Sequence, residues 1–280
     1  MSDQQTIQGT IERLRTRGDA RGSTNWPNGE PDYVAEYSLT EEHIPALISL
    51  ATQWVDAPAD DVVVYGPVHA WRALAQLRAT AAVQPLLDVQ DQLDAVGDDW
   101  YLEEFPQVFG LMGPPAMEPL ASYLGESAHA EYSLVNAASG LREIAVRFPE
   151  TRGRIVALLT EQLAQHRAEE LNAHLVSDLL DLNAVEAAET IERAFAAGVV
   201  DPSVAGDWGD IRQKLGVPGL GIAPDRSPGW PTIRERLGYP DPDAERQRRT
   251  TDRKKRKKAL CQAKARLKSK RKNRKHRTPR

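Results

Sequence analysis

Apolar residues recur every three or four positions along most of the chain, which is the spacing of one face of an α-helix. The clearest example lies at 68–87, where Trp71, Leu74 and Leu77 share one helical face. After a short break the same spacing resumes, with Leu86 on the second stretch. This pattern predicts two helices that are joined by a tight turn.

The same helical pair recurs along the chain. Leu77, Ala82 and Leu86 find equivalents 34 residues later and again 105 residues later, which is about three periods. The equivalents are Leu111, Ala116 and Leu120, then Leu182, Ala187 and Ile191. A period of this length is typical of stacked helical hairpins, because one hairpin buries only part of its apolar face and its neighbours cover the rest. A non-repeating helical bundle with chance resemblance between its parts is the alternative.

The first strong helix start follows a stretch rich in glycine and proline at 18–37, which predicts a loop. Ser38 precedes Glu41 by three residues, the spacing of a capping box, and Thr40 offers a second possible cap. The predicted helix runs to about Trp54. Near the other end of the body, Trp208, Ile211 and Leu215 are spaced as in a terminal capping helix, in a run that ends near 216. These signals divide the chain into a short helix and loop at 1–37, a repeat body at 38–216, a Pro/Gly-rich linker at 217–243 and a tail at 244–280.

The segment VHAWRALAQLRATAAVQPLL at 68–87 resembles HEAT-type repeats, especially the short bacterial variety similar to phycobilisome-lyase repeats. The resemblance covers roughly 65–200. It implies an all-α fold, a HEAT-like α-solenoid of about four to five helical hairpins, and a binding scaffold. Gln76 replaces the usual glycine before the inter-helix turn, whereas Gly110 keeps it in the second unit. No catalytic motif of the lyase members can be matched, so we expect neither their chemistry nor a cofactor.

Charge divides the chain more sharply than its net value of -4 suggests. Residues 244–280 contain 19 Lys and Arg against two acids, a net charge of +17, whereas 1–243 carry 17 basic and 38 acidic residues, a net charge of -21. No apolar run approaches the ~20 residues that span a bilayer, and the N-terminus lacks a secretory pattern. Cys261 is the only cysteine, which excludes an intrachain disulfide. We therefore expect a cytoplasmic protein.

The tail is the strongest functional signal. It has too few apolar residues to offset the entropy of ordering, so we expect it to be disordered alone. Its lysines and arginines would hold phosphates of a nucleic acid or another polyanion in a salt-sensitive way. Without aromatic residues it cannot stack on bases. A solvated tail, or one that pairs with the acidic body, is the alternative. The candidate contacts are Arg253, Lys254, Lys255, Arg256, Lys257, Lys258, Lys264, Arg266, Lys268, Lys270, Arg271, Lys272, Arg274 and Lys275.

The body offers a candidate surface for a protein partner. Paired acids recur along it, and His69 with Arg72 could line a concave groove, while Trp100 could be an exposed anchor beside the Asp98–Asp99 turn. The tentative set is His69, Arg72, Asp98, Asp99, Trp100, Glu103 and Glu104. The alternative is that these acids belong to solvated helix faces. Trp71 itself is expected to lie in the core.

Catalytic and metal-binding patterns are missing from the sequence. The six histidines have no metal-ligand spacing, and a turn is expected between His166 and His174. Cys261 lies among cations, which would raise its reactivity, but no base is arranged around it. We therefore predict a non-catalytic scaffold or adaptor of unknown oligomeric state. The alternatives are an assembly or chaperone-like factor for a basic or ribosomal partner, an acidic body that shields the tail, and, least favoured, a HEAT-fold enzyme, which would need a basic groove.

Overall fold

The fold is known from a computed structural model, which describes residues 3–22, 26–29, 31–53 and 62–217. The chain divides into two compact units, 1–223 and 224–280, and all described residues lie in the first. Across the described ranges the structure is all-α, with short 3-10 turns and no strand. The helices are α1 (Asp3–Arg15), α2 (Tyr33–Tyr37), α3 (Ile44–Ala51), α4 (Gly66–Gln76), α5 (Val83–Val96), α6 (Trp100–Met112), α7 (Met117–Gly125), α8 (Glu131–Arg147), α9 (Arg152–Ala164), α10 (Glu169–Asp181), α11 (Ala188–Ala196), α12 (Pro202–Ala205) and α13 (Trp208–Leu215).

Four helical pairs follow one another with the predicted spacing. In each pair a 3-10 turn follows the first helix after one to three residues and leads directly into the second helix. These second helices are α5, α7, α9 and α11. Successive second helices begin 34, 35 and 36 residues apart. The turns themselves are Thr80–Ala82, Pro114–Ala116, Pro149–Thr151 and Val185–Ala187. Pro85 and Pro119 lie in the first turns of α5 and α7, as the sequence predicted, where no backbone donor is needed.

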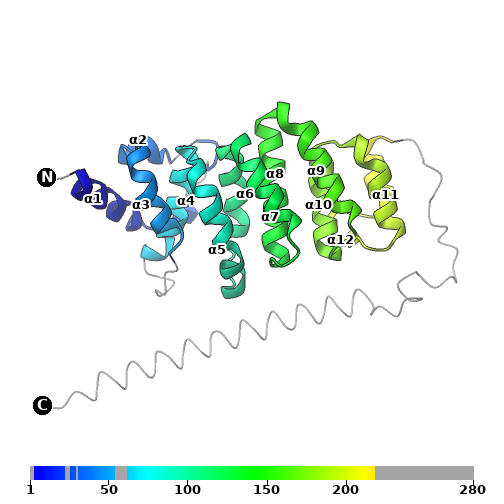
Figure 1. Cartoon of the computed structure of the whole chain (residues 1–280), viewed down its shortest axis with the longest axis horizontal. Helices are drawn as coiled ribbons and strands as arrows, with labels where there is room; N and C mark the ends of the chain where they lie inside the picture. The colour runs from blue at the N-terminus through cyan, green and yellow to red at the C-terminus, as the bar shows by residue number, and fades with distance from the viewer. Residues whose placement is uncertain (1–2, 23–25, 30, 54–61, 218–280) are drawn as a thin grey trace, which may run out of the picture. The chain divides into compact units, whose positions relative to one another are not determined.

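The pairs pack side by side in two layers (Figure 1). The first helices contact one another in chain order, α4 to α6 to α8 to α10, and the second helices do the same from α5 to α11. Each of α7 and α9 also packs against the first helix of the next pair. Apolar side chains from both layers, with many alanines among them, form one continuous core.

Close approach of α6 and α8 depends on glycine. A Cβ atom on Gly110 would lie 2.7 Å from the Cβ of Glu143, and one on Gly140 would lie 3.2 Å from Phe109. Aromatic rings fill the neighbouring core, where Trp71 meets Phe105 edge to face at 4.8 Å between centroids. Trp71 is therefore a core residue, as the sequence predicted.

Two turns that lie 105 residues apart share an unusual backbone geometry. Arg78 and Asn183 both adopt the left-handed conformation, with φ of 51° and 48°. After each of them a backbone N–H bonds back across the turn, from Ala79 to Leu74 and from Ala184 to Leu179, both at 2.9 Å. This Schellman arrangement ends the first helix and aims the chain into the second.

The same geometry identifies a helical pair that the sequence did not predict. Ser38 is also left-handed, with φ of 51°, and the N–H of Leu39 bonds to the carbonyl of Val34 at 3.0 Å. Helices α2 and α3 flank this turn, so the loop predicted for 18–37 is wrong in its last part. Ser38 terminates α2, and Thr40 provides the cap of the next turn. The predicted end near Trp54 lies outside the described residues, and α3 itself ends at Ala51.

Both ends of the described body are covered by helices. At the N-terminal end, α1 packs on α3 and α4, and its residues Ile11 and Leu14 are buried. At the C-terminal end α13 packs on α10 and α11, and the predicted capping residues Trp208, Ile211 and Leu215 are buried. Over the described ranges, none of the helices is both long and apolar enough to cross a membrane. The tail at 244–280 and all but the first residue of the predicted linker lie outside them.

Candidate functional site

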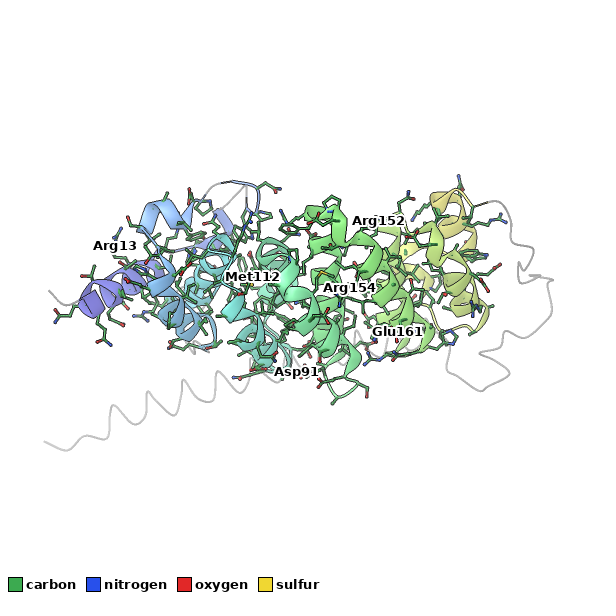
Figure 2. All side chains as sticks on the ribbon, turned by 45° about the horizontal axis from the view of Figure 1, so that its top comes forward. Arg13, Asp91, Met112, Arg152, Arg154 and Glu161 are labelled. Carbon is green, nitrogen blue, oxygen red and sulfur yellow. The ribbon has the colours of Figure 1, made fainter. Side chains whose placement is uncertain are left out.

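The turns that lead from one helical pair to the next lie along one edge of the body. Three contacts establish this arrangement. Asp91 in the second half of α5 bonds to His129 of the α7–α8 turn. Arg167 of the α9–α10 turn donates to the carbonyl of Leu124 at the end of α7. Tyr132 at the start of α8 donates to Glu170 at the start of α10. The turns within the pairs lie at the opposite edge, and Figure 2 shows Asp91 and Arg152 on these two sides.

Acidic side chains collect at the first of these edges. The segment 79–141 contains ten Asp and Glu and no Lys or Arg. Arg167 does lie at this edge, but it donates to the carbonyls of Leu124 and Glu126 and to the side chain of Gln162. We call the following nine residues the acidic edge: Asp91, Asp94, Asp98, Asp99, Glu103, Glu126, Glu131, Glu169 and Glu170.

Helix starts explain much of this distribution. Glu103, Glu131 and the pair Glu169 and Glu170 lie in the first turns of α6, α8 and α10. The N-terminal end of a helix carries partial positive charge from its free N–H groups, so carboxylates there are stabilising. Because every first helix begins at the same edge, this local preference produces a collective negative surface.

Asp91 is the most heavily bonded member of the acidic edge. Its carboxylate accepts from the hydroxyl of Tyr123 at 3.1 Å, from the backbone N–H of Ala130 at 2.9 Å and from Nδ1 of His129 at 2.8 Å. The His129 ring stacks on Tyr123, with centroids 3.7 Å apart, and its Nε2 lies 3.4 Å from Glu126. Burial alone would raise the pKa of Asp91, but the bonds from His129 and Ala130 outweigh it and the pKa is lowered.

The α5–α6 turn is less exposed than the sequence predicted. Asp98 accepts from the N–H of Trp100 at 2.8 Å, and burial raises the pKa of its carboxyl. Trp100 is half-buried and meets Tyr65 edge to face at 5.7 Å, so its ring is part of the packing between helices rather than a free anchor. Asp99 and Glu103 are exposed and remain candidates for contact with a partner.

Three of the predicted surface residues are buried, which corrects the prediction. Arg72 is 4% exposed and forms an ion pair with Glu104, which is also 4% exposed, with Nε 3.0 Å from Oε2. His69 is completely buried between the hydroxyl of Tyr33 and the carbonyl of Gly18, and burial lowers its pKa to about 4. The concave groove predicted at His69 and Arg72 is filled because the N-terminal residues fold over α4, which a local pattern could not indicate.

A second, partly buried ionic cluster was not indicated by the sequence. Arg142 of α8 donates to Asp178 of α10 at 2.9 Å and also pairs with Glu143 and with Asp181. Burial raises the pKa of Asp178 to about 7. No sequence signal marked it, since Asp178 lies in an ordinary helical stretch and meets Arg142 only when α8 and α10 pack together.

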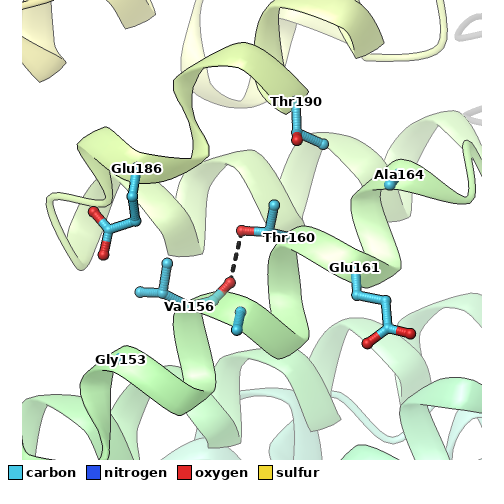
Figure 3. Close-up of a pocket in the computed structure, with 8 residues that line it drawn as sticks. Gly153, Val156, Thr160, Glu161, Ala164, Glu186 and Thr190 are labelled. Atoms are coloured by element: carbon cyan, nitrogen blue, oxygen red, sulfur yellow. Dashed lines mark hydrogen bonds between the residues drawn. The ribbon is translucent and has the colours of Figure 1, made fainter.

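An open hollow of about 490 Å³ lies between α9 and α11 (Figure 3). Six residues of α9 line it, with Glu186 and Thr190 on the other side; the six are Gly153, Val156, Ala157, Thr160, Glu161 and Ala164. The hydroxyl of Thr160 donates to the carbonyl of Val156 at 2.6 Å, so the hydroxyl is engaged within its own helix. This surface presents short side chains, which suits packing rather than chemistry.

Metal-binding clusters are not found in the part of the chain that the structure describes. There, no group of three or more His, Cys, Asp and Glu side chains could hold a metal ion. A turn separates His166 from α10, which carries His174, as predicted. The predicted polyanion contacts between Arg253 and Lys275 lie outside the described residues, as does Cys261. No protein-family model, curated protein or solved structure matches this chain.

Proposed function

We propose that this chain is a HEAT-like α-solenoid that acts as a non-catalytic adaptor. Its acidic edge would bind a lysine- and arginine-rich segment of a partner protein, and its tail would contact a polyanion such as a nucleic acid. The recurrent turns and the two layers of helices support the solenoid assignment. The expectation of a cytoplasmic location belongs to the same proposal.

The observation that carries the proposal is the segregation of charge. Acids recur at successive inter-pair turns, and the segment 79–141 contains no lysine or arginine. By contrast, the opposite edge carries both positively and negatively charged side chains. Arg152 there donates to the carbonyls of Leu182 and Asn183 and pairs with Glu186. The acidic edge is therefore the surface that would select a partner by its charge.

The strength of such contacts follows from their exposure. An exposed ion pair contributes about 0.2–1 kcal/mol, so four or five pairs would give a few kcal/mol in total. Such a total corresponds to weak binding, with a dissociation constant of roughly 1 mM or higher if apolar contacts are few. Screening over about 8 Å at physiological salt makes the interaction strongly dependent on ionic strength. An adaptor that exchanges partners fits these magnitudes.

The experiment is affinity capture with the full chain and with a chain that lacks 244–280, each with and without nuclease. Partners that bind the acidic edge should be retained by both proteins and survive nuclease. Nucleic acids should be captured only by the full chain and should disappear with nuclease. If deletion of the tail removes every partner, the body is not the binding surface; if nucleic-acid capture is unchanged by the deletion, the assignment of the tail is wrong.

A further inference from the structure

Two aspartates of α5 are each held by a tyrosine from another helix. Tyr101 of α6 donates its hydroxyl to Asp94 at 3.1 Å, and Tyr123 of α7 donates to Asp91 at the same distance. Both tyrosines are buried, whereas both carboxylates are half-buried and reach the surface at the acidic edge. Asp91 and Asp94 are three residues apart on one helical face, so the two pairs are neighbours.

A third hydroxyl lies behind these two pairs. Ser133 of α8 is completely buried, and its oxygen makes no hydrogen bond of normal geometry within the described chain. Burial raises the pKa of Tyr101 and of Tyr123, and the Ser133 hydroxyl opposes this rise in both, so it faces both phenolic oxygens. It also faces the carboxylate of Asp91. Oxygen atoms from α5, α6, α7 and α8 therefore converge on one part of the acidic edge, around a buried hydroxyl that has no partner.

Asp94 is the carboxylate of this group that lacks a basic partner. Asp91 pairs with His129 at 2.8 Å, whereas the carboxylate of Asp94 accepts only the bond from Tyr101 among the described residues. The segment 79–141 around it contains no lysine or arginine. Carboxylates that are partly withdrawn from water are usually paired with a cation. The position of Asp94 therefore favours a cation that another molecule supplies.

We propose that these side chains, which we call the lysine seat, receive a single lysine of the basic partner. The lysine seat consists of Asp91, Asp94, Tyr101, Tyr123 and Ser133. The inference rests on the proposed function, since it names the part of the acidic edge that recognises the partner. An ammonium group is a compact charge with three N–H donors, which suits oxygens that converge from several helices. Asp94 forms the ion pair, and Ser133 provides the innermost oxygen.

The bonds within the lysine seat favour lysine over arginine. A guanidinium group binds a carboxylate best through two parallel N–H bonds, one to each oxygen. One oxygen of Asp94 already accepts from Tyr101, and both oxygens of Asp91 are engaged. The planar guanidinium must therefore compete with these bonds, whereas an ammonium group needs only one oxygen of each carboxylate.

Two labelled peptides that differ only in carrying lysine or arginine at every basic position test the lysine seat in the full chain. We expect the wild type to bind the lysine peptide at least threefold more tightly at low salt, as measured by fluorescence anisotropy. Asp94→Asn should weaken binding of the lysine peptide at least fivefold. Asp88→Asn is the matched control, because it removes the same charge from an exposed position of α5 and should weaken binding less than twofold.

The hydroxyl variants separate a role in binding from a role in packing. Tyr101→Phe keeps the buried ring and removes only the hydroxyl, so it should bring the affinities for the two peptides within twofold of each other. Ser133→Ala should weaken binding of the lysine peptide at least twofold without lowering the midpoint of thermal unfolding. A hydroxyl that is merely buried would give unchanged binding in Ser133→Ala. If Tyr101→Phe does not fold, the comparison of Asp94→Asn with Asp88→Asn decides.

Three results would overturn the lysine seat. Equal losses for Asp94→Asn and Asp88→Asn would mean that net charge governs binding. Equal affinity of the wild type for the two peptides would contradict selection of an ammonium group. Retention of the lysine preference in a folded Tyr101→Phe variant would show that the hydroxyl does not provide it.

Failure of the lysine seat and failure of the proposed function give different results. If neither peptide binds the wild type, the proposed function fails and the lysine seat fails with it. If both peptides bind and Asp94→Asn has no effect, the adaptor function stands and the lysine seat is wrong. In that case binding should still be weakened by combined substitution of exposed acids elsewhere on the acidic edge, at Asp99, Glu103 and Glu126.

Discussion

Asp91 of α5 holds His129 of the α7–α8 turn, with 2.8 Å between the carboxylate Oδ2 and the ring Nδ1. The same carboxylate accepts from Tyr123 and from the backbone of Ala130, so one side chain fastens the whole turn to the preceding helical pair. The Asp91→Asn variant keeps the shape but can accept fewer of these bonds. We expect it to lower the free energy of unfolding by about 1–3 kcal/mol in urea titrations.

The neighbouring Asp88→Asn variant is the control for that measurement. Asp88 is exposed and accepts only a bond from the side chain of Gln84 one turn earlier. Its substitution should change stability very little. If both variants behave alike, the bonds made by Asp91 are not what secures the turn.

Substitution of the adjacent Glu103 and Glu104 in α6 should affect stability very differently. Glu104 is buried with Arg72, whereas Glu103 is exposed. Glu104→Gln leaves a buried guanidinium without its charged partner, and we expect it to cost about 3–5 kcal/mol of stability. Glu103→Gln should leave stability close to that of the wild type. Chemical denaturation measures the free energy of unfolding of both variants. A small effect at Glu104 would show that the ion pair with Arg72 does not stabilise the packing of α4 on α6.

Two glycines in helices provide a second contrast. In Gly110→Ala the new Cβ would lie 2.7 Å from that of Glu143, so α6 and α8 must move apart. Overpacking of this kind costs about 1–3 kcal/mol. Gly153→Ala meets nothing within 4 Å and should stabilise the protein by up to about 1 kcal/mol. Thermal unfolding should therefore shift the midpoint down for the first variant and up for the second, and shifts of the same sign would contradict the packing described for α6 and α8.

Asp178 predicts a specific dependence of stability on pH. Burial raises the pKa of its carboxyl from 3.8 to about 7. The folded state therefore holds this proton more tightly than the unfolded state, so stability should fall as the pH rises from about 4 to about 7. The slope is at most about 1.4 kcal/mol per pH unit, and it vanishes outside this window.

Asp178→Asn removes that titration. As the pH rises from about 4 to about 7, we expect the free energy of unfolding of the wild type to fall relative to that of Asp178→Asn. A difference that stays constant from pH 4 to pH 8 would mean that Arg142 keeps the carboxylate charged in the folded state at all these values.

Local patterns predicted the helical pairs well because each pair carries its own apolar face and its own turn. Leu77, Leu111 and Leu182 marked equivalent positions, and the turns recur with the spacing that these residues predicted. Burial of His69 and Arg72 could not be predicted, because it depends on Gly18 and Ala20, which are about fifty residues away. The acidic edge could be predicted only in part. The acids were visible in the sequence, but their position at a common edge follows only from the alternating direction of the helices.

Binding of a lysine-rich peptide to charge variants of the full chain tests the central claim most directly. The edge variant Asp99→Asn, Glu103→Gln, Glu126→Gln, Glu169→Gln removes four charges from the acidic edge. The matched control Glu41→Gln, Glu42→Gln, Glu150→Gln, Glu189→Gln removes four charges from other surfaces. If the edge is the binding surface, the edge variant should lose at least tenfold in affinity at low salt, and the control should lose less than threefold. Equal losses for the two variants would contradict the account, since net charge and not the acidic edge would then govern binding.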